Sequence, residues 1–310
     1  MSKIITITFS PSVDKSTMIS ALEPEKKLKC STPKLEPGGG GINIARVLKK
    51  LGTEAIAVFP SGGYNGSLFN ELLEKENVPS IIVKVQHETR ENFVVQDKST
   101  RKQFRFVMPA NELSEKECNA CLEAIKNIND IDFIIASGSL PPGIPIKILE
   151  QLAEISKIKK AKFVVDTSGP ALKNVMANEV FMLKPNLAEL AYLSGRKSLV
   201  ASDAEPAAKR IIALGNCEII LVSLGAQGAL LVTKNQSFTV KPPAVLVKST
   251  VGAGDSMLAG MVYALSKGNN LKTSLEFSVA CGTAATMNYG TSLCHKKDVE
   301  SLFKEISNRG

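Results

Sequence analysis

The sequence has 310 residues, of which 44% are hydrophobic and 22% charged, with a formal net charge of +8. This composition excludes disordered and collagen-like chains, and no apolar run approaches the ~20 residues that span a bilayer. The first residues lack the basic, apolar and small-residue segments of a secretory signal. We therefore expect a cytoplasmic protein that does not contact a membrane.

The positive charge does not indicate a nucleic-acid partner. Lysines occur as scattered pairs, tryptophan is absent and aromatic residues make up only 5% of the chain, so the sequence offers neither a basic stripe nor a stacking platform. A modest positive excess is equally suited to attracting small anionic substrates.

Along the chain, short apolar or β-branched runs alternate with amphipathic stretches. The predicted strands are Ile4–Phe9, Ala55–Phe59, Phe133–Ala136, Lys162–Asp166, Val180–Leu183 and Ile219–Ser223. The predicted helices are Asn43–Leu51, Gly66–Glu76, Ser114–Ile128, Pro145–Ile155, Ala204–Leu214, Ser256–Ser266, Leu271–Met287 and Lys297–Ile306. This alternation predicts an α/β fold, in which a mostly parallel sheet lies between two layers of helices.

Two segments do not follow the alternation. Residues 15–34 and 92–107 read as extended chain, and the second resembles a hairpin that turns at Lys98–Thr100. Neither segment has the length or pattern of a βαβ crossover. We therefore predict one α/β domain over residues 1–310 that carries a small accessory sheet.

The six cysteines do not form a disulfide or metal framework. Cys118 and Cys121 form a C-x-x-C, but they lie inside a predicted helix that begins with a capping box, Ser114 and Glu117. Redox C-x-x-C motifs normally open a helix after a strand, and a zinc site needs a second pair of ligands. We expect two partly buried thiols in a reducing compartment.

The run Gly38–Gly41 directly precedes a helical pattern. Four consecutive glycines are entropically costly, and a structural loop rarely needs more than two of them. The polar side chain of Asn43 interrupts an otherwise apolar first turn. The sequence predicts a ligand-binding loop at this position.

A second glycine-containing segment, STVGAGDS, is followed at once by an apolar helix. Gly252, Ala253 and Gly254 would present free N–H groups at the helix N-terminus, where the dipole favours negative charge. Such a site suits the charge on a transferring phosphoryl group. Asp255 follows in the first turn, where a carboxylate can take a proton from an attacking hydroxyl group.

Other nucleotide-binding patterns are incomplete. The loop SLGAQG at residues 223–228 lies between two apolar runs and is no more specific than a hairpin turn. The segment GSLPPG lacks the Lys-Ser or Lys-Thr of a Walker A loop, and no strand–GxGxxG–helix unit is present.

Taken together, these segments resemble the PfkB (ribokinase-like) family of carbohydrate kinases, and within it the 6-phosphofructokinases. The resemblance extends over nearly the whole chain, through FSPSVDKS, EPGGGGINIAR, TRENF, QFRFVMPA, ASGSLPPG, VDTSG, LKPNLAEL, VSLGAQGAL, STVGAGDSM and NYGTSLC. It implies a ribokinase-like fold, with the two extended segments as a lid that serves as a dimer interface.

The resemblance also implies an activity, the ATP-dependent phosphorylation of fructose 6-phosphate at its C1 hydroxyl. Asp255 would be the catalytic base, and the backbone amides of Gly252, Ala253 and Gly254 would hold the developing charge. The residues implied to bind the sugar phosphate are Asp14, Gly39, Asn43, Arg90, Arg105 and Ser139. Among them, the arginines suit the 6-phosphate because guanidinium binds phosphate in a bidentate manner.

For the nucleotide, the resemblance implies Lys184, Asn186, Ser223, Gly225 and Gly228. Glu189 would act on Mg²⁺ through water, although from the residues alone Asn186 and Glu189 are equally well explained as a helix capping box. A monovalent cation, K⁺ in many relatives, would bind at Ser249, Val251, Ala285, Asn288 and Gly290.

The sequence departs from the expected pattern in NYGTSLC, where Ser292 replaces an arginine and Tyr289 a glutamine. Both flank the expected cation and adenine region, so nucleotide affinity and K⁺ dependence are open to change. Tagatose-6-phosphate kinase and 1-phosphofructokinase remain alternatives, because they share the phosphosugar motifs. A non-catalytic sugar-phosphate sensor is an alternative of another class, and the intact G-A-G-D segment argues against it.

Overall fold

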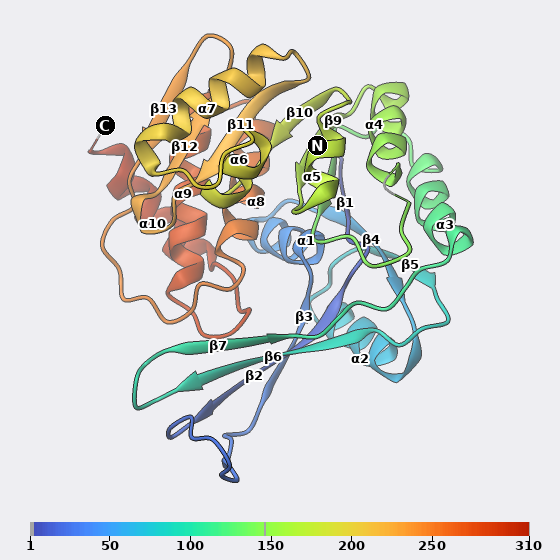
Figure 1. Ribbon diagram of the computed structural model, residues 1–310, viewed down its shortest axis with the longest axis vertical. Coiled ribbons are helices and arrows are strands. Elements are labelled where there is room, and N and C mark those ends of the chain that lie inside the picture. The colour runs from blue at the N-terminus through green and yellow to red at the C-terminus, as the bar shows by residue number, and fades with distance from the viewer. Residues whose placement is uncertain (1–2, 146, 310) are drawn as a thin grey trace.

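Two β-sheets organise the chain, a large one in the body of the molecule and a small one that stands beside it (Figure 1). The computed structural model describes residues 3–145 and 147–309. Thirteen strands and ten α-helices are assigned in these residues.

The large sheet has nine strands. They are β1 (Ile4–Ile7), β4 (Ala55–Ser61), β5 (Ser80–Lys84), β8 (Phe133–Ser137), β9 (Lys162–Asp166), β10 (Val180–Leu183), β11 (Cys217–Ser223), β12 (Ala229–Val232) and β13 (Ser237–Val240). Their order is β13-β12-β11-β10-β9-β8-β1-β4-β5. All pairs from β5 to β11 are parallel, whereas β12 and β13 pair antiparallel. The predicted mostly parallel sheet is confirmed.

Helices cover both faces of this sheet (Figure 1). One layer contains α1 (Gly40–Leu51), α2 (Gly63–Lys75), α8 (Ala253–Ser266), α9 (Leu271–Thr286) and α10 (Lys296–Ser307). The other contains α3 (Glu115–Lys126), α4 (Ile148–Lys159), α5 (Pro170–Val175), α6 (Leu187–Leu193) and α7 (Ala201–Ala213). Because strand side chains alternate between faces, Ile4 joins the first core and Ile5 and Ile7 join the second.

The predicted elements of the body are all present, with shifted ends. Helix α1 begins at Gly40 and α8 at Ala253, each several residues before the apolar pattern starts, because small residues continue the helix without contributing to that pattern. The prediction for residues 145–155 includes position 146, which lies outside the described residues, and the helix there begins at Ile148. Strands β5 and β13 and helix α5 were missed, since segments of four to six residues show too little periodicity. The start of α6 is where the capping box of Asn186 and Glu189 indicates a helix.

The small sheet, called the lid below, has four strands: β2 (Ser12–Ile19), β3 (Lys34–Gly38), β6 (Arg90–Asp97) and β7 (Gln103–Val107). Their order is β3-β2-β6-β7, in which β2 and β6 are parallel and the other pairs antiparallel. The accessory sheet and its hairpin are confirmed. Strands β2 and β6 begin at residues 12 and 90, earlier than predicted, so Asp14 and Arg90 belong to the lid itself.

The C-x-x-C motif lies in α3 as predicted, and the capping box of Ser114 and Glu117 is formed. Cys118 and Cys121 are buried, and burial raises the pKa of Cys121 to about 12, so its thiol stays protonated. Over residues 3–145 and 147–309, no helix combines the length and apolarity needed to cross a membrane.

Candidate active site

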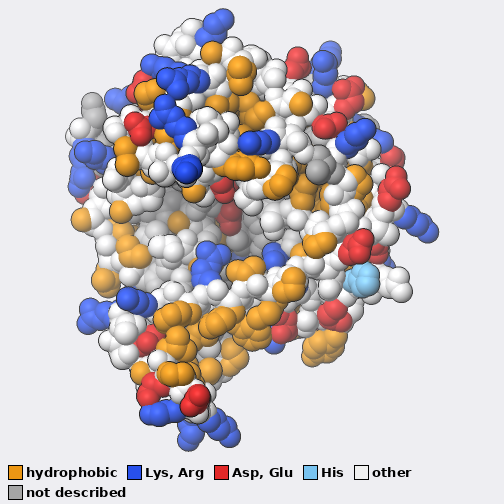
Figure 2. Space-filling view, in the orientation of Figure 1, with side chains coloured by type: hydrophobic (Ala, Val, Ile, Leu, Met, Phe, Trp, Pro, Cys, Tyr) orange, Lys and Arg blue, Asp and Glu red, His pale blue; other side chains and the backbone are white. Residues whose placement is uncertain are grey.

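A cleft of about 260 Å³ lies between the lid and the carboxyl ends of the parallel strands. It appears as the hollow near the centre of Figure 2, with acidic atoms inside and basic side chains at its lower rim. Ten predicted site residues line it: Asp14, Gly39, Asn43, Arg90, Arg105, Ser139, Glu189, Val251, Gly252 and Asp255. The fold thus brings together residues from both ends of the chain, at the edge of the sheet where α/β proteins bind ligands.

The glycine run is explained by close backbone packing as well as by the cleft. Gly39 has φ +112°, which side-chain-bearing residues rarely adopt. A Cβ at Gly40 would lie 2.2 Å from Ser137 Oγ, and one at Gly38 would lie 2.3 Å from Asp14 Oδ2. The run therefore lets the end of β3 approach β2 and the start of α1 approach the ends of β1 and β8, and it leaves Gly39 and Gly40 on the cleft wall.

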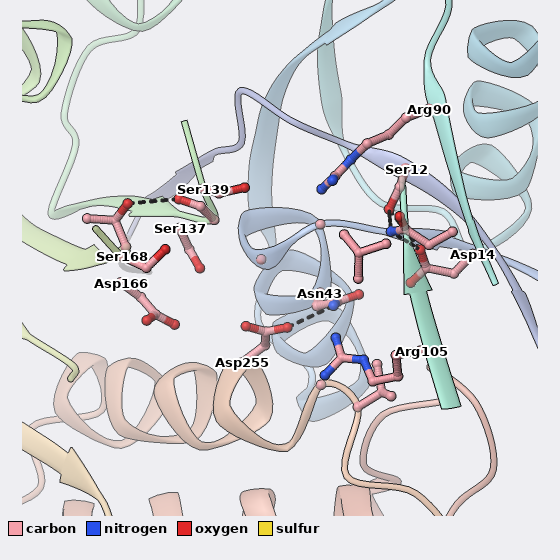
Figure 3. Close-up of a pocket in the computed structure, with 18 of the residues that line it drawn as sticks. Ser12, Asp14, Asn43, Arg90, Arg105, Ser137, Ser139, Asp166, Ser168 and Asp255 are labelled. Carbon is pink, nitrogen blue, oxygen red and sulfur yellow. Dashed lines mark hydrogen bonds between the residues drawn. The ribbon is translucent and has the colours of Figure 1, made fainter. Parts of the chain in front are cut away.

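Asp255 lies half-buried in the first turn of α8, facing the cleft (Figure 3). Its Oδ2 accepts a hydrogen bond of 2.8 Å from Asn43 Nδ2. Burial and the nearby carboxylate of Asp166 raise the pKa of Asp255 to about 6, although Asn43, Lys184 and Arg105 favour the ionised form. The group is ionised at neutral pH and is a stronger base than an ordinary aspartate.

Lys184 lies beside this carboxylate and pairs with Asp166, with 3.1 Å between Nζ and Oδ1. Burial alone would lower the pKa of Lys184, but Asp166 and Asp255 outweigh it and raise the pKa, so the ammonium is retained. Asp166 lies in the segment VDTSG, and no role is predicted for it from the sequence. Its position at the carboxyl end of a predicted parallel strand is the signal that points to it.

The start of α8 lies beside Lys184 and has no side-chain cap. Gly252 is the N-cap with φ +74°, and no side chain caps the first N–H groups of the helix. A Cβ at Gly254 would lie 3.4 Å from Lys184 Nζ, so the ammonium approaches the backbone closely there. The Ala253 N–H donates to the carbonyl oxygen of Thr250 at a long 3.4 Å, so it is only weakly engaged. The uncapped helix start, its dipole and an ammonium group converge at this point.

Asp14 is held by two residues that sequence analysis missed. Its Oδ1 accepts hydrogen bonds from Ser12 Oγ at 2.8 Å and Asn92 Nδ2 at 3.0 Å. The parallel register of β2 and β6 sets Asp14 opposite Asn92. Burial raises the pKa of Asp14, an effect that these hydrogen bonds oppose. Asn92 lies two residues after Arg90, so both side chains project from one face of β6, which is the signal that marks it.

The two predicted arginines differ in their surroundings. Arg90 donates to the carbonyl oxygens of Met108 at 3.0 Å and Ser10 at 3.1 Å, while its buried Nε has no partner among the described residues. Burial lowers the pKa of Arg90, but an arginine stays charged at physiological pH. Arg105 is exposed on β7 and extends toward Asn43 and Asp255 (Figure 3). Ser139 is exposed on the opposite wall.

A second cavity, of about 680 Å³, adjoins the cleft at the start of α8. Four predicted nucleotide residues line it: Asn186, Ser223, Gly225 and Gly228. Its remaining walls are largely apolar and include Pro242, Pro243, Val245, Val247 and Met257. Gly228 has φ +94° and its Cβ would lie 2.0 Å from Val240 O, so a tight turn closes this cavity. Since Ala253 and Gly254 also line it, the two cavities meet beside Asp255.

Glu189 lies in the first turn of α6, where both the cleft and the capping box of that helix involve its side chain. The capping box is formed, because Asn186 Oδ1 accepts from the Glu189 N–H at 2.9 Å and Glu189 Oε2 accepts from the Asn186 N–H at 2.8 Å. Its side chain also lines the cleft. Burial and the nearby Asp166 raise the pKa of Glu189. Asp166 and Glu189 both line the cleft, and two neighbouring carboxylates of this kind fit a hydrated Mg²⁺.

The predicted monovalent-cation residues come from two loops that the fold brings together. Ser249 Oγ donates to Gly290 O at 3.1 Å and accepts from the Val251 N–H at 3.2 Å. Asn288 Nδ2 bonds the carbonyl oxygen of Leu293 at 3.0 Å, and Ala285 lies in the last turn of α9. Carbonyl and hydroxyl oxygens are the ligands that K⁺ prefers, so the donor set fits this ion.

The two departures from the expected pattern lie outside the residues that line either cavity. Ser292 Oγ accepts from Lys34 Nζ at 2.7 Å and thereby contacts the lid. Tyr289 is 47% exposed, and Lys248 Nζ lies 5.3 Å from the centre of its ring. Both residues lie next to Asn288 and Gly290, which are predicted to bind the cation, but neither lines the apolar cavity.

Known carbohydrate kinases resemble this chain over nearly its whole length. The model of the pfkB family of carbohydrate kinases matches residues 4–298. The ATP-dependent 6-phosphofructokinase isozyme 2 of Escherichia coli K12 is 40% identical over 308 residues, covering 99% of this chain and 100% of the relative. A 1-phosphofructokinase of Borreliella burgdorferi is 30% identical, covering 98% and 97%.

Solved structures of the same family have a similar fold. Phosphofructokinase-2 from Escherichia coli in complex with fructose-6-phosphate superposes with a TM-score of 0.93 at 38% identity, over 99% of this chain and 100% of the other. The same Escherichia coli protein has been solved in complex with potassium and in a tetrameric inhibited form, with TM-scores of 0.94 and 0.93. This chain belongs to the pfkB family of carbohydrate kinases.

Proposed function

We propose that this protein is an ATP-dependent 6-phosphofructokinase that phosphorylates the C1 hydroxyl of fructose 6-phosphate. The observation that carries the proposal is the position of Asp255. It lies where a polar cleft with two arginines meets an apolar cavity, at a helix N-terminus that no side chain caps. A sugar phosphate suits the first space and an adenine nucleotide the second.

Asp255 acts as the general base. Its carboxylate takes the proton of the C1 hydroxyl as the hydroxyl oxygen attacks the γ-phosphorus of ATP. The new C1 O–P bond forms while the bond between the γ-phosphorus and the β,γ-bridging oxygen breaks, so ADP leaves. A base with a pKa of about 6 is matched to this proton transfer near neutral pH.

Charge on the transferring phosphoryl group is met by fixed partners. The amides of Gly252, Ala253 and Gly254 and the ammonium of Lys184 stand next to the base. Because these groups are already oriented before the reaction, they require little reorganisation in the transition state. Asp166 and Glu189 would hold Mg²⁺ through its water ligands, and Mg²⁺ would neutralise charge on the ATP phosphates.

The lid and α1 hold the sugar phosphate. Asp14 keeps Oδ1 occupied by Ser12 and Asn92, so Oδ2 remains to accept from a sugar hydroxyl. Arg90 and Arg105, whose side chains line the cleft, bind the 6-phosphate together with Ser139. Gly39 and Asn43 complete the sugar contacts from the start of α1. The loops at Ser249 and Gly290 would bind K⁺, which would set the position of the neighbouring α8 N-terminus.

We further propose that two copies associate through their lids. Apolar side chains gather on the lid in Figure 2, and Leu22, Phe106 and Met108 are each more than a third exposed. Light scattering should give the mass of a dimer, and Phe106→Asp should shift it toward the monomer. All six cysteines are free, which supports a cytoplasmic location.

The deciding experiment measures ADP release with Mg-ATP and compares fructose 6-phosphate, tagatose 6-phosphate and fructose 1-phosphate by kcat/KM. A preference for fructose 6-phosphate that Asp255→Asn abolishes supports both the reaction and the base. Preference for fructose 1-phosphate would match the 1-phosphofructokinase relatives, and preference for tagatose 6-phosphate would give the other kinase alternative. Tight sugar-phosphate binding without turnover would instead indicate a sensor.

A further inference from the structure

A buried guanidinium lies directly behind the base and its partner, outside the cleft. Arg46 follows Asn43 by three residues on α1, so both side chains lie on the same face of the helix. The Arg46 side chain is only 1% exposed. A charged group is rarely buried to this degree unless it is paired, so its partners indicate what it does.

One side of the guanidinium is neutralised by an ion pair. Nε donates to Glu76 Oε2 at 2.8 Å and Nη2 donates to Glu76 Oε1. Glu76 follows the end of α2 and is 29% exposed, so this pair links two elements of the body. The ion pair explains how the charge is tolerated, but it involves only part of the donor set.

The remaining donors face three segments of the site. Nη1 lies 2.8 Å from Pro37 O at the end of the lid strand β3 and 3.2 Å from Thr291 O in the loop after α9. It also lies 3.4 Å from Asn43 Oδ1. One amino group thus contacts the lid connection, the loop beside the proposed cation site and the residue that binds Asp255.

These contacts determine which way the Asn43 amide points. Its two ends differ chemically, because Oδ1 only accepts and Nδ2 only donates hydrogen bonds. With Oδ1 toward Arg46, Nδ2 donates to Asp255 at 2.8 Å. A reversed amide would set its N–H groups against the guanidinium and its oxygen against the carboxylate. Arg46 therefore excludes the orientation that would repel the base.

Thr291 is fixed by the same cluster. Glu36 on β3 accepts from the Thr291 N–H at 3.1 Å and from its hydroxyl at 3.2 Å, while Arg46 donates to its carbonyl oxygen. All polar groups of this residue are thus engaged by α1 and β3. Since Gly290 precedes Thr291, the cluster also fixes the loop on which the proposed cation site depends.

We propose that Arg46 is a positioning residue for phosphoryl transfer, which orients Asn43 so that it donates to Asp255 and fixes the loop at Thr291 against the sugar site. The inference rests on the proposed function, in which Asp255 is the base. Arg46 touches neither substrate, and its effect passes through Asn43.

The test compares Arg46→Lys with Glu76→Gln. A lysine can still pair with Glu76, but its single ammonium group cannot also reach Asn43 and Thr291. Glu76→Gln weakens the ion pair and leaves the Nη1 contacts in place, so it is the matched control for lost stability. The charged groups that face Asp255 from other elements, Asp166, Lys184 and Arg105, are unchanged in both variants.

For Arg46→Lys we expect kcat to fall about tenfold, because a hydrogen bond to a charged group is lost from the base. The acid limb of the kcat profile should move to higher pH, since Asn43 no longer favours the ionised form of Asp255. KM for the sugar should change less than kcat. Glu76→Gln should lower Tm and leave the acid limb where it is in the wild type.

If Arg46→Lys lowers Tm but leaves kcat and the acid limb unchanged, Arg46 is only structural and the proposal is overturned. If that variant does not fold, the double variant Arg46→Met, Glu76→Leu removes both charges at similar volume and should show the same acid-limb shift. If the wild type is active and the Arg46 variants keep its kcat and acid limb, the positioning role of Arg46 is refuted but the proposed function stands. A wild type inactive on every sugar phosphate refutes the proposed function and this inference together.

Discussion

Replacing Asp255 by asparagine should stabilise the folded protein at pH 8 while removing most of its activity. The folded site raises the pKa of this carboxyl from 3.8 to about 6, which means that the fold disfavours the ionised form. Two pKa units correspond to about 3 kcal/mol, so this is the upper bound of the gain. Asparagine carries no charge, its oxygen can still accept from Asn43, and Lys184 remains paired with Asp166.

The difference in stability between the Asp255→Asn variant and the wild type depends on pH. A group whose pKa is higher in the folded state disfavours folding fully above the folded pKa and not at all well below the unfolded one. The stability gap between the variant and the wild type should therefore be largest above about pH 6 and shrink to about 0.5 kcal/mol near pH 4. Thermal unfolding of both ligand-free proteins at pH 8, 6, 5 and 4 measures it, with a rise of about 2–4 °C per kcal/mol expected at pH 8.

Asp298→Asn is a suitable control, because Asp298 also lies in the first turn of a helix, α10, but away from the cleft. Its loss should destabilise the protein by about 0.3–1 kcal/mol through the helix dipole. An Asp255→Asn protein that is less stable than the wild type at pH 8, or a gap of equal size at pH 4 and pH 8, would refute the reasoning. Either result would mean that the folded protein does not disfavour the ionised form of Asp255.

Three further outcomes are expected. The acid limb of the wild-type kcat/KM profile should have its midpoint at about pH 6, because Asp255 of the free enzyme must be ionised to accept a proton, and a midpoint near 4 would exclude it as the base. Arg105→Ala should raise KM for the sugar phosphate far more than KM for ATP, and equal effects in steady-state kinetics would argue against its place at the 6-phosphate. Gly40→Ala should lower stability by about 1–3 kcal/mol in urea unfolding, since its Cβ would lie 2.2 Å from Ser137 Oγ, whereas unchanged stability would show that α1 can shift away.

The sequence alone was sufficient for the parallel core of the large sheet, although not for its outer strands β5 and β13, and it marked the segment before Asp255 as a helix start. Parallel strands buried on both faces are short continuous apolar runs, and the glycines before Asp255 mark a helix N-terminus that presents its amides. These features are local, so a single segment of chain reveals them.

The groups that orient the predicted residues were not foreseen. Asn92 reaches Asp14 only because β2 and β6 pair in parallel, and the sequence carries no signal for that register. Arg46 looks like one more charged residue of an amphipathic helix until α2 and the loop at Thr291 cover it. Likewise, the glycine run was interpreted as a ligand loop alone, because its contacts with Ser137 and Asp14 join segments far apart in the sequence.

The lid consists of two insertions, one between β1 and α1 and the other between β5 and α3, and neither interrupts the order of the large sheet. Lid and body are therefore separate in the order of the chain, and a lid from another member of the family could be transplanted onto this body, where Gly39, Asn43 and Ser139 would still line the cleft. The two insertions would have to be exchanged as a pair, because they share one sheet. The recipient loops at Ser249 and Thr291 must be chosen with them, since Gln103 and Glu36 of the lid bond to these positions.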